Sequence, residues 1–183
     1  MNITLDKKID DVTVIDYKSF KDDRGHFSEV YVSDLISNII PNFSIKQINF
    51  SRSMKNVARG LHLQVTPPMG KLMRVINGSA TLFAFDCRKN NQIEKKIIEL
   101  NLNSNSNKLV WAPYYYARGF ISHEDNTLIE YFCTEKYNAQ GEYAINLLDD
   151  NFNHQFEINN LLFSEKDKSA MGISDWFALN ANL

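Results

Sequence analysis

The chain has 183 residues, a formal net charge of −2 and a pI near 6.1. This charge balance argues against a general affinity for nucleic acid or for an anionic membrane surface. No apolar run approaches the length of a membrane-spanning helix, and the first residues lack the basic-then-apolar pattern of a secretory signal. We therefore expect a cytoplasmic protein that binds neither nucleic acid nor membrane.

Short strands dominate the elements that the sequence predicts. A helix of one or two turns is expected at 33–38 and another from Ser164 onwards. Apolar and polar residues alternate, as in half-buried strands, at 43–50, 71–76, 80–87, 93–100, 109–112 and 127–134. Many short strands without helical crossovers predict an antiparallel all-β protein, either a sandwich or a closed barrel.

Local signals add detail to this outline. Asn77-Gly78 predicts a tight hairpin, because both residues tolerate positive φ. Cys87 and Cys133 are too few for a disulfide framework and suit buried, reduced thiols. Residues 1–183 are expected to form a single domain, with a core at about 12–160 and a short C-terminal helix and tail at 161–183. In that tail, Trp176 and Phe177 either dock on the body or belong to a subunit contact.

A basic cluster gives the first indication of chemistry. Arg59, His62 and Lys71 fall on two neighbouring extended segments. An anion clamp, a near-neutral proton acceptor and an ammonium group are suited to moving a proton next to a ketone. An isolated histidine is more often structural, but cations are not gathered inside a barrel for stability. Strict alternation would put Arg59 and His62 on opposite faces, unless Gly60 carries a β-bulge.

Further polar residues have both a functional and a structural interpretation. Tyr131 is either a core residue with a tethered hydroxyl or an acid facing the histidine. Asp167 closes a helix capping box that begins at Ser164, and it equally suits orientation of His62. Gln47 and Asn49 share a strand face and are either sugar ligands or solvated side chains.

A metal or other cofactor is not expected. The segment His62-Leu63-Gln64 lacks the second histidine that a metal-binding barrel would present, and no cysteine pair is spaced for zinc. Phosphate-binding glycine loops and nucleophile elbows are also absent from the sequence.

The order and spacing of several motifs resembles the dTDP-4-dehydrorhamnose 3,5-epimerase family of nucleotide-sugar epimerases. The resemblance runs from about residue 14 to residue 167. The motifs that carry it are Asp23-Arg24-Gly25-x-Phe27-x-Glu29, Gln47-x-Asn49-x-Ser51, Arg59-Gly60-Leu61-His62, Gly70-Lys71-Leu72, Phe85-Asp86-x-Arg88, Ala117-x-Gly119-Phe120 and Tyr131.

The resemblance implies a cupin-type jelly-roll barrel (a double-stranded β-helix) with short peripheral helices. It also implies a metal-free homodimer that acts on nucleoside-diphospho-4-keto-6-deoxyhexoses, in pathways such as O-antigen or lipopolysaccharide biosynthesis. By this resemblance His62 is the base, Asp167 orients it, Lys71 stabilises the enolate oxygen and Tyr131 returns a proton to the opposite face.

The same resemblance assigns substrate contacts. Arg59 would meet the diphosphate, with Gln47 and Asn49 lining the same region. Arg24, Phe27 and Glu29 would reach the nucleotide across the dimer, from the partner subunit.

Three positions depart from the family pattern. Arg118 stands where the family usually has histidine, close to the sugar, and a guanidinium holds an oxyanion but does not exchange a proton near neutral pH. The stretch 147–150 reads Leu-Leu-Asp-Asp in place of Trp-Asn-Asp-Pro, and Lys136 replaces an expected aromatic residue. These departures indicate altered substrate or regiochemistry.

The sequence thus predicts a cofactor-independent isomerase that epimerises the sugar at C3, at C5 or at both. A C3-only epimerase, a 3,4-ketoisomerase of the same substrate class and a non-catalytic barrel that binds nucleotide sugars remain open. The ketoisomerase would move the proton along one face and would therefore not need Tyr131.

Overall fold

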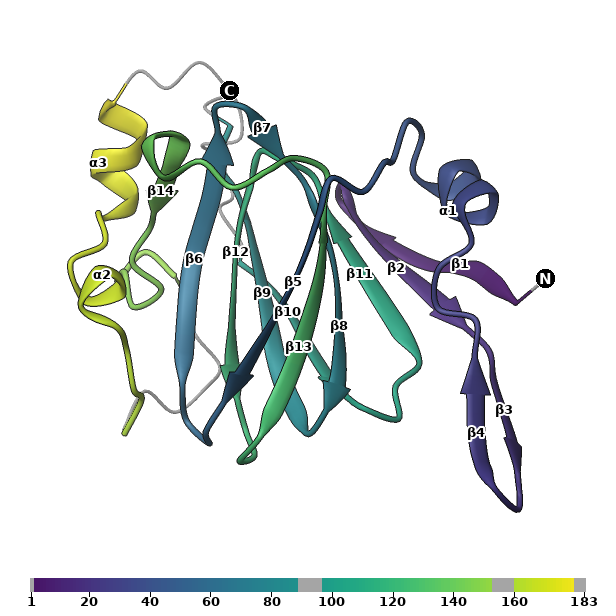
Figure 1. Cartoon of the computed structure of the whole chain (residues 1–183). Helices are drawn as coiled ribbons and strands as arrows, with labels where there is room; N and C mark the ends of the chain where they lie inside the picture. Colours follow the sequence, from purple (N-terminus) through teal and green to yellow (C-terminus); the bar gives the residue numbers. More distant parts are fainter. Residues whose placement is uncertain (1, 89–96, 153–159, 180–183) are drawn as a thin grey trace.

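The computed structural model describes residues 2–88, 97–152 and 160–179 (Figure 1). Its helices are α1 (Ser33–Ile39), α2 (Glu165–Lys168) and α3 (Ile173–Ala178), with a 3-10 turn at Ala139–Gly141. Its strands are β1 (Ile3–Ile9), β2 (Val12–Tyr17), β3 (Ser19–Asp22), β4 (Gly25–Ser28), β5 (Gln47–Ser53), β6 (Ala58–Val65), β7 (Pro68–Met69), β8 (Lys71–Asn77), β9 (Ser79–Asp86), β10 (Ile98–Asn103), β11 (Lys108–Ala112), β12 (Tyr116–Ser122), β13 (Thr127–Cys133) and β14 (Glu142–Ala144).

The strands form two facing sheets and a separate hairpin. The first sheet has the order β1-β2-β11-β8-β13-β5, and the second has the order β10-β9-β12-β6-β14, with β7 pairing to β6. The pairings within both sheets are antiparallel. Strands β3 and β4 pair with each other and project from the end of the body that carries α1 (Figure 1).

Each sheet is buried on both faces over much of its length. Between the sheets lies an apolar core that includes Val14, Val110 and Leu82. The outer face of the second sheet is covered by the C-terminal segment, where Trp176 is 1% exposed and its indole N–H donates to the Cys87 carbonyl at 2.9 Å. The outer face of the first sheet packs against α1 through residues such as Ile36. The tail is therefore docked on the body at Trp176.

The two curled sheets form the predicted all-β, cupin-type jelly roll. Of the predicted elements, the helix at 33–38 and the strands at 71–76, 80–87, 109–112 and 127–134 are confirmed within one or two residues. The predicted strand at 93–100 lies partly outside the described residues, and its described part begins at Ile98. The C-terminal helix expected from Ser164 is present as α2, and Ser164 is its N-cap.

Two sequence predictions are wrong in detail. The strand predicted at 43–50 begins only at Gln47, because Phe43 instead packs edge-on against Trp111 with ring centroids 5.3 Å apart. The Asn77-Gly78 turn does not close a hairpin, because β8 belongs to the first sheet and β9 to the second. Gly78 has a φ of +75°, and the Asn77 side-chain amide donates across the loop to the Asn126 carbonyl.

A β-bulge at Gly60 sets the position of the polar residues on β6. His62 pairs with Arg118 and Arg59 pairs with Phe120, so the two residues Gly60 and Leu61 face one residue of β12. The extra residue lets Arg59 and His62 line the same cavity. The bulge expected from the sequence is confirmed.

Gly60 tests this arrangement. Its φ is +101°, and a Cβ built there would lie 2.6 Å from the Arg118 carbonyl oxygen and 2.7 Å from the Gly119 Cα. We expect Gly60→Ala to lower the free energy of unfolding in urea by roughly 2–5 kcal/mol, from backbone strain plus the backbone clash.

Gly25→Ala is the matched control. Gly25 also has positive φ, at +131°, but no atom lies within 4 Å of the position that a Cβ would take there. A loss of about 1 kcal/mol is expected from strain alone. Equal losses in the two variants would contradict the role of close packing at the bulge.

Candidate active site

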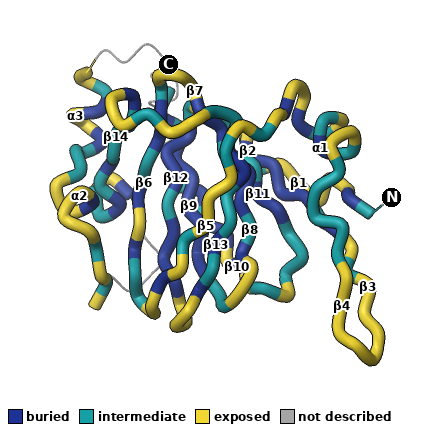
Figure 2. The backbone as a smooth tube through the Cα atoms, viewed as in Figure 1, coloured by how far each residue is buried: buried dark blue, intermediate teal, exposed yellow. Residues whose placement is uncertain are grey.

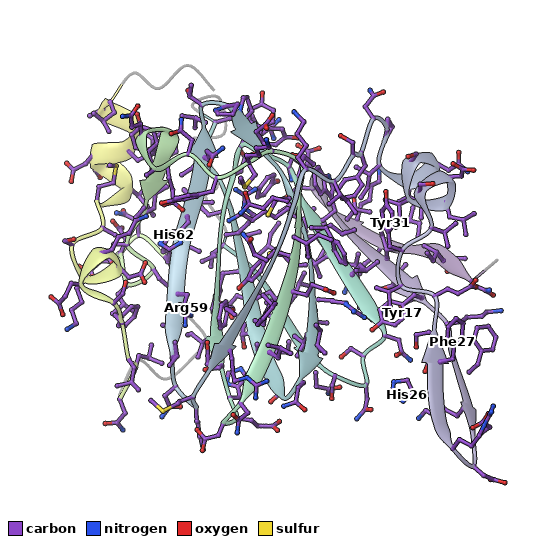
Figure 3. The ribbon with its side chains drawn as sticks, in the orientation of Figure 1. Tyr17, His26, Phe27, Tyr31, Arg59 and His62 are labelled. Carbon is purple, nitrogen blue, oxygen red and sulfur yellow. The ribbon has the colours of Figure 1, made fainter. Side chains whose placement is uncertain are left out.

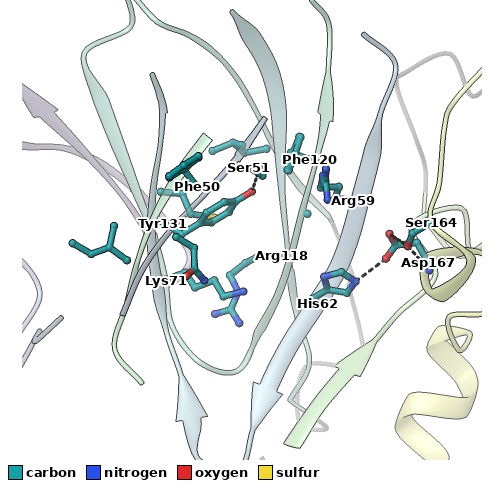
Figure 4. A pocket seen from close by; sticks show the side chains of 15 residues that line it. Phe50, Ser51, Arg59, His62, Lys71, Arg118, Phe120, Tyr131, Ser164 and Asp167 are labelled. Carbon is teal, nitrogen blue, oxygen red and sulfur yellow. Dashed lines mark hydrogen bonds and ion pairs between the residues drawn. The ribbon is translucent and has the colours of Figure 1, made fainter. Parts of the chain in front are cut away.

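A cavity of about 580 Å³ opens between the two sheets on the side of β5 and β6 (Figure 4). It takes residues from β5, β6, β8, β9, β12 and β13, and from the start of α2. The chemically active residues that line it are Arg59, His62, Lys71, Arg118, Tyr131 and Asp167. Residues more than a hundred positions apart in sequence thus meet in one space.

His62 and Asp167 form a hydrogen-bonded pair on one wall. His62 Nε2 lies 2.6 Å from Asp167 Oδ1, and the Asp167 side chain is 4% exposed. Ser164 Oγ donates to the other carboxylate oxygen at 2.7 Å, and the Gly60 amide donates to Oδ1 at 3.3 Å. An ionised Asp167 accepts hydrogen bonds only, so Nε2 carries the hydrogen and Nδ1 keeps the lone pair.

Asp167 is therefore both a capping-box residue and the partner of the histidine. Its backbone N–H donates to Ser164 Oγ at 3.2 Å while its carboxylate meets His62. Burial opposes ionisation of this carboxyl, but the hydrogen bonds from His62, Ser164 and Gly60 outweigh it and hold its pKa below the ordinary value. Both contacts that the sequence left open are therefore present, and the orienting role of Asp167 stays a prediction.

Tyr131 lies on β13 in the opposite sheet. Its hydroxyl is hydrogen-bonded to Ser51 Oγ at 3.0 Å, across the pairing of β13 with β5. Burial raises the pKa of Tyr131 to about 12, against the weaker lowering effect of the Ser51 hydrogen bond. The phenol is therefore a neutral hydrogen-bond and proton donor at physiological pH.

Two cations lie next to this phenol. Lys71 Nζ is 5.9 Å from the centroid of the Tyr131 ring, and burial together with the Arg118 charge lowers the pKa of Lys71 to about 8. Arg118 is 4% exposed, and its Nη1 donates to the carbonyl oxygens of Met69 at 2.9 Å and Pro113 at 3.1 Å. Burial lowers the pKa of Arg118 to about 10, so the guanidinium remains charged.

Of the other predicted substrate-binding residues, some lie at the cavity and some lie far from it. Arg59 is exposed at the cavity and its Nε donates to Ser53 Oγ at 3.3 Å. Asn49 lines the cavity, and Gln47 reaches it only by donating to Asn49 Oδ1 at 2.9 Å.

The hairpin residues are not brought to this cavity within the protomer. Figure 3 shows Phe27 at the far end of the body from Arg59 and His62. Arg24 is paired with Asp22 at 2.6 Å, Phe27 stacks on Phe20, and Glu29 accepts a hydrogen bond from Asn2.

Two serines, which the sequence did not single out as site residues, belong to the site. Ser51 and Ser164 hold the phenol and the carboxylate, respectively. Ser51 follows Asn49 by two residues, so the strand period alone places both side chains on one face. The capping box at Ser164 predicted the start of a helix, but it did not predict that the Ser164 hydroxyl also donates a hydrogen bond to the Asp167 carboxylate.

The described part of the chain shows neither a metal-ligand cluster nor a membrane-spanning helix. Over residues 2–88, 97–152 and 160–179, no three His, Cys, Asp or Glu side chains are grouped to hold a metal ion. No helix in the same ranges is long and apolar enough to span a membrane.

The fold and the cavity define a cupin-type protein with an acid–base site between its sheets. The family model described as dTDP-4-dehydrorhamnose 3,5-epimerase matches residues 6–175. The chain belongs to this family, which confirms the sequence-based resemblance and agrees with the expected epimerase of the isomerase class.

Individual relatives span nearly the whole chain. A dTDP-4-dehydrorhamnose 3,5-epimerase of Shigella flexneri is 31% identical over 169 residues, which cover 91% of this chain and 93% of the relative. The crystal structure of the Sulfolobus tokodaii enzyme of the same name has a TM-score of 0.85 and 31% identity, and covers 95% of this chain and 97% of that one.

A third relative was solved with a ligand. It is a dTDP-6-deoxy-D-glucose-3,5-epimerase of Legionella pneumophila in complex with dTDP-4-keto-L-rhamnose, with a TM-score of 0.88 and 27% identity. The match covers 94% of this chain and 93% of that one.

The buried carboxylate gives a pH-dependent prediction. Because the pKa of Asp167 is lowered by folding, its stabilising effect is present above the ordinary aspartate pKa and is lost as the pH falls through the folded value. We expect Asp167→Asn to lower the free energy of unfolding by roughly 1–3 kcal/mol at neutral pH, with the difference shrinking in acid.

Chemical denaturation of the unmodified protein and of Asp167→Asn, from neutral pH down through the folded pKa of Asp167, measures this difference in the free energy of unfolding. Asp23→Asn, at an exposed position, is the control and should change stability by less than about 0.5 kcal/mol throughout. A pH-independent loss in Asp167→Asn would show that shape, and not charge, stabilises the pair.

Proposed function

We propose that this protein epimerises a nucleoside-diphospho-4-keto-6-deoxyhexose at C3 and C5 by way of an enolate. The observation that carries the proposal is the position of His62, with its buried carboxylate partner, across one cavity from the neutral phenol of Tyr131. Inversion at carbon needs a base on one face and an acid on the other, and these two residues come from opposite sheets.

At each of the two carbons, the reaction proceeds in two proton transfers. His62 Nδ1 takes the proton from the carbon next to the ketone, and the C–H electron pair forms the carbon–carbon double bond while negative charge moves to O4. The Lys71 ammonium stabilises that oxygen, and this lowers the principal barrier, because such a C–H is a very weak acid. Tyr131 then protonates the carbon from the other face, and solvent restores both residues.

Asp167 fixes the tautomer and orientation of His62 and stabilises the imidazolium that forms.

Arg59 is proposed to meet the diphosphate, since it is an exposed cation at the cavity, and Asn49 with Gln47 completes that side. The ligand in the Legionella relative supports dTDP as the nucleotide. Cys87 and Cys133, both buried thiols, support a cytoplasmic setting.

A homodimer is proposed as the working unit. Figure 2 shows exposed stretches on β5 and on the projecting hairpin. On β5, Phe50 is 73% exposed and Ile48 is 55% exposed, and both also line the cavity; on the hairpin, Phe27 is 65% exposed. Such an exposed apolar surface favours a partner subunit. In the proposed dimer the hairpin carries Arg24, Phe27 and Glu29 to the nucleotide site of the partner subunit.

Proton NMR of dTDP-4-keto-6-deoxyglucose in deuterated water tests the activity. We expect the C3 and C5 proton signals to disappear as the enzyme exchanges them with solvent. His62→Asn should slow the exchange by about 10²–10⁴-fold, the usual contribution of one acid–base group. Retained exchange in that variant would overturn the assignment of the base.

Tyr131→Phe separates the alternatives in the same assay. The epimerase mechanism predicts exchange without efficient inversion, because the acid is missing. Full activity would favour the 3,4-ketoisomerase, and loss of the C3 signal alone in the unmodified protein would favour C3-only epimerisation. If the protein binds the nucleotide sugar but exchanges none of its protons with solvent, whether the nucleotide is dTDP or another, a non-catalytic barrel would be favoured.

Light scattering coupled to gel filtration tests the dimer. We expect the unmodified chain to elute as a dimer and Phe50→Glu to elute as a monomer, because the charge would be buried unpaired. Leu5→Glu, which also replaces an exposed apolar residue (48%) but on β1, should remain dimeric. A monomeric unmodified protein would contradict the shared site.

A further inference from the structure

Among the residues that the structure describes, Arg118 has no acidic partner to account for its burial. Its Nη1 is anchored by backbone carbonyl oxygens, whereas its Nε and Nη2 are buried without a hydrogen-bond partner among the described residues. A buried cation is ordinarily paired, because removing its hydration is costly. The unpaired charge therefore points to a function near the cavity that Arg118 lines.

Arg118 lines the cavity, but Nε and Nη2 of its guanidinium are shielded from solvent. We therefore expect a substrate oxygen to meet Lys71 more readily than Arg118. Figure 4 shows the Lys71 and Arg118 side chains next to each other, and the Arg118 charge is the largest electrostatic influence on Lys71 after burial. Arg118 thus acts on the cavity through its field.

The other ionisable groups around Lys71 do not cancel this field. On β13, Cys133 pairs directly with Lys71 in the sheet and is kept neutral by burial, as is Tyr131. On β14, Glu142 is already paired with Lys166 of α2. Across the cavity, Asp167 is engaged by His62. Lys71 and Arg118 are therefore two cations whose neighbouring carboxylates, among the described residues, have other partners.

We propose that Arg118 is a positioning residue that acts through Lys71: its fixed, buried charge lies beside the Lys71 side chain in the same cavity and strengthens the oxyanion site there. The proposal rests on the proposed function, in which the Lys71 ammonium holds O4 of the enolate. A guanidinium stays charged throughout the working pH range, so its field is constant and Lys71 becomes the group that titrates.

The alkaline limit of activity follows from this pairing. The Lys71 pKa is lowered to about 8, so the ammonium is present below that pH and is lost as the pH rises through it. Removing the Arg118 charge relieves the second largest of the causes that lower the Lys71 pKa, and leaves burial and the weaker effect of the Lys166 charge. The Lys71 titration then moves to higher pH, while the oxyanion site becomes weaker at neutral pH.

NMR titration of ¹³C-labelled Lys71 in the protein without substrate tests the charge effect. Arg118→Gln keeps an amide donor for the carbonyl oxygens but removes the charge, and Arg118→Lys keeps the charge. We expect the titration midpoint to rise by about one pH unit in Arg118→Gln and to stay near the unmodified value in Arg118→Lys. Equal midpoints in all three proteins would overturn the proposal, and Arg118→Met is the neutral alternative if the glutamine variant does not fold.

The pH profile of kcat in the exchange assay supplies the second readout. We expect Arg118→Gln to be about 10- to 100-fold slower at neutral pH, with an alkaline limb displaced upward, whereas damage to the fold alone would lower kcat without moving the limb. An undisplaced limb in a folded Arg118→Gln overturns the proposal. Absence of exchange in the unmodified protein would instead reject the proposed function, while the Lys71 titration still decides the role of Arg118.

Discussion

One buried carboxylate, Asp167, holds the site together. It accepts from His62 on β6, from the Gly60 amide at the bulge and from the Ser164 hydroxyl at the start of α2. The same contact joins the C-terminal segment to the second sheet and fixes the tautomer of the histidine. A single group thus couples the docking of the tail to the readiness of the base, and the bulge at Gly60 makes this meeting geometrically feasible.

Negative and positive side chains lie on different walls of the cavity. The carboxylate lies on the side of the histidine, where it would favour the imidazolium that the proposed mechanism forms. The cations Lys71 and Arg118 line the cavity with the phenol, where the proposed mechanism places the negative charge of the substrate. Burial strengthens both effects, because a low dielectric weakens screening. In the proposed mechanism, this arrangement is preorganised for an enolate and not for the neutral ketone.

Alternation along the chain predicted the all-β class and, in whole or in part, six of the fourteen described strands, namely β5, β8, β9, β10, β11 and β13, because side-chain period is a local property. The candidate site residues came instead from the basic cluster and the family resemblance, and their roles stay predictions. The failures have non-local causes. Asn77-Gly78 has the composition of a hairpin turn, but the strands that flank it pair in different sheets. The unpaired burial of Arg118 depends on which carbonyl oxygens and carboxylates the fold brings near it. The sequence also left the role of Asp167 open, because an aspartate at this position suits a helix capping box and a hydrogen bond to His62 equally well.

The crystal structure of the protein with dTDP-6-deoxyglucose bound is the most direct test of the central claim. This ligand lacks the C4 ketone and so should remain unreacted. The account predicts a sugar ring between His62 and Tyr131, with O4 within hydrogen-bond distance of Lys71 Nζ and the Asp167 contact retained. A sugar placed with both residues on one face, or outside the cavity, would contradict it.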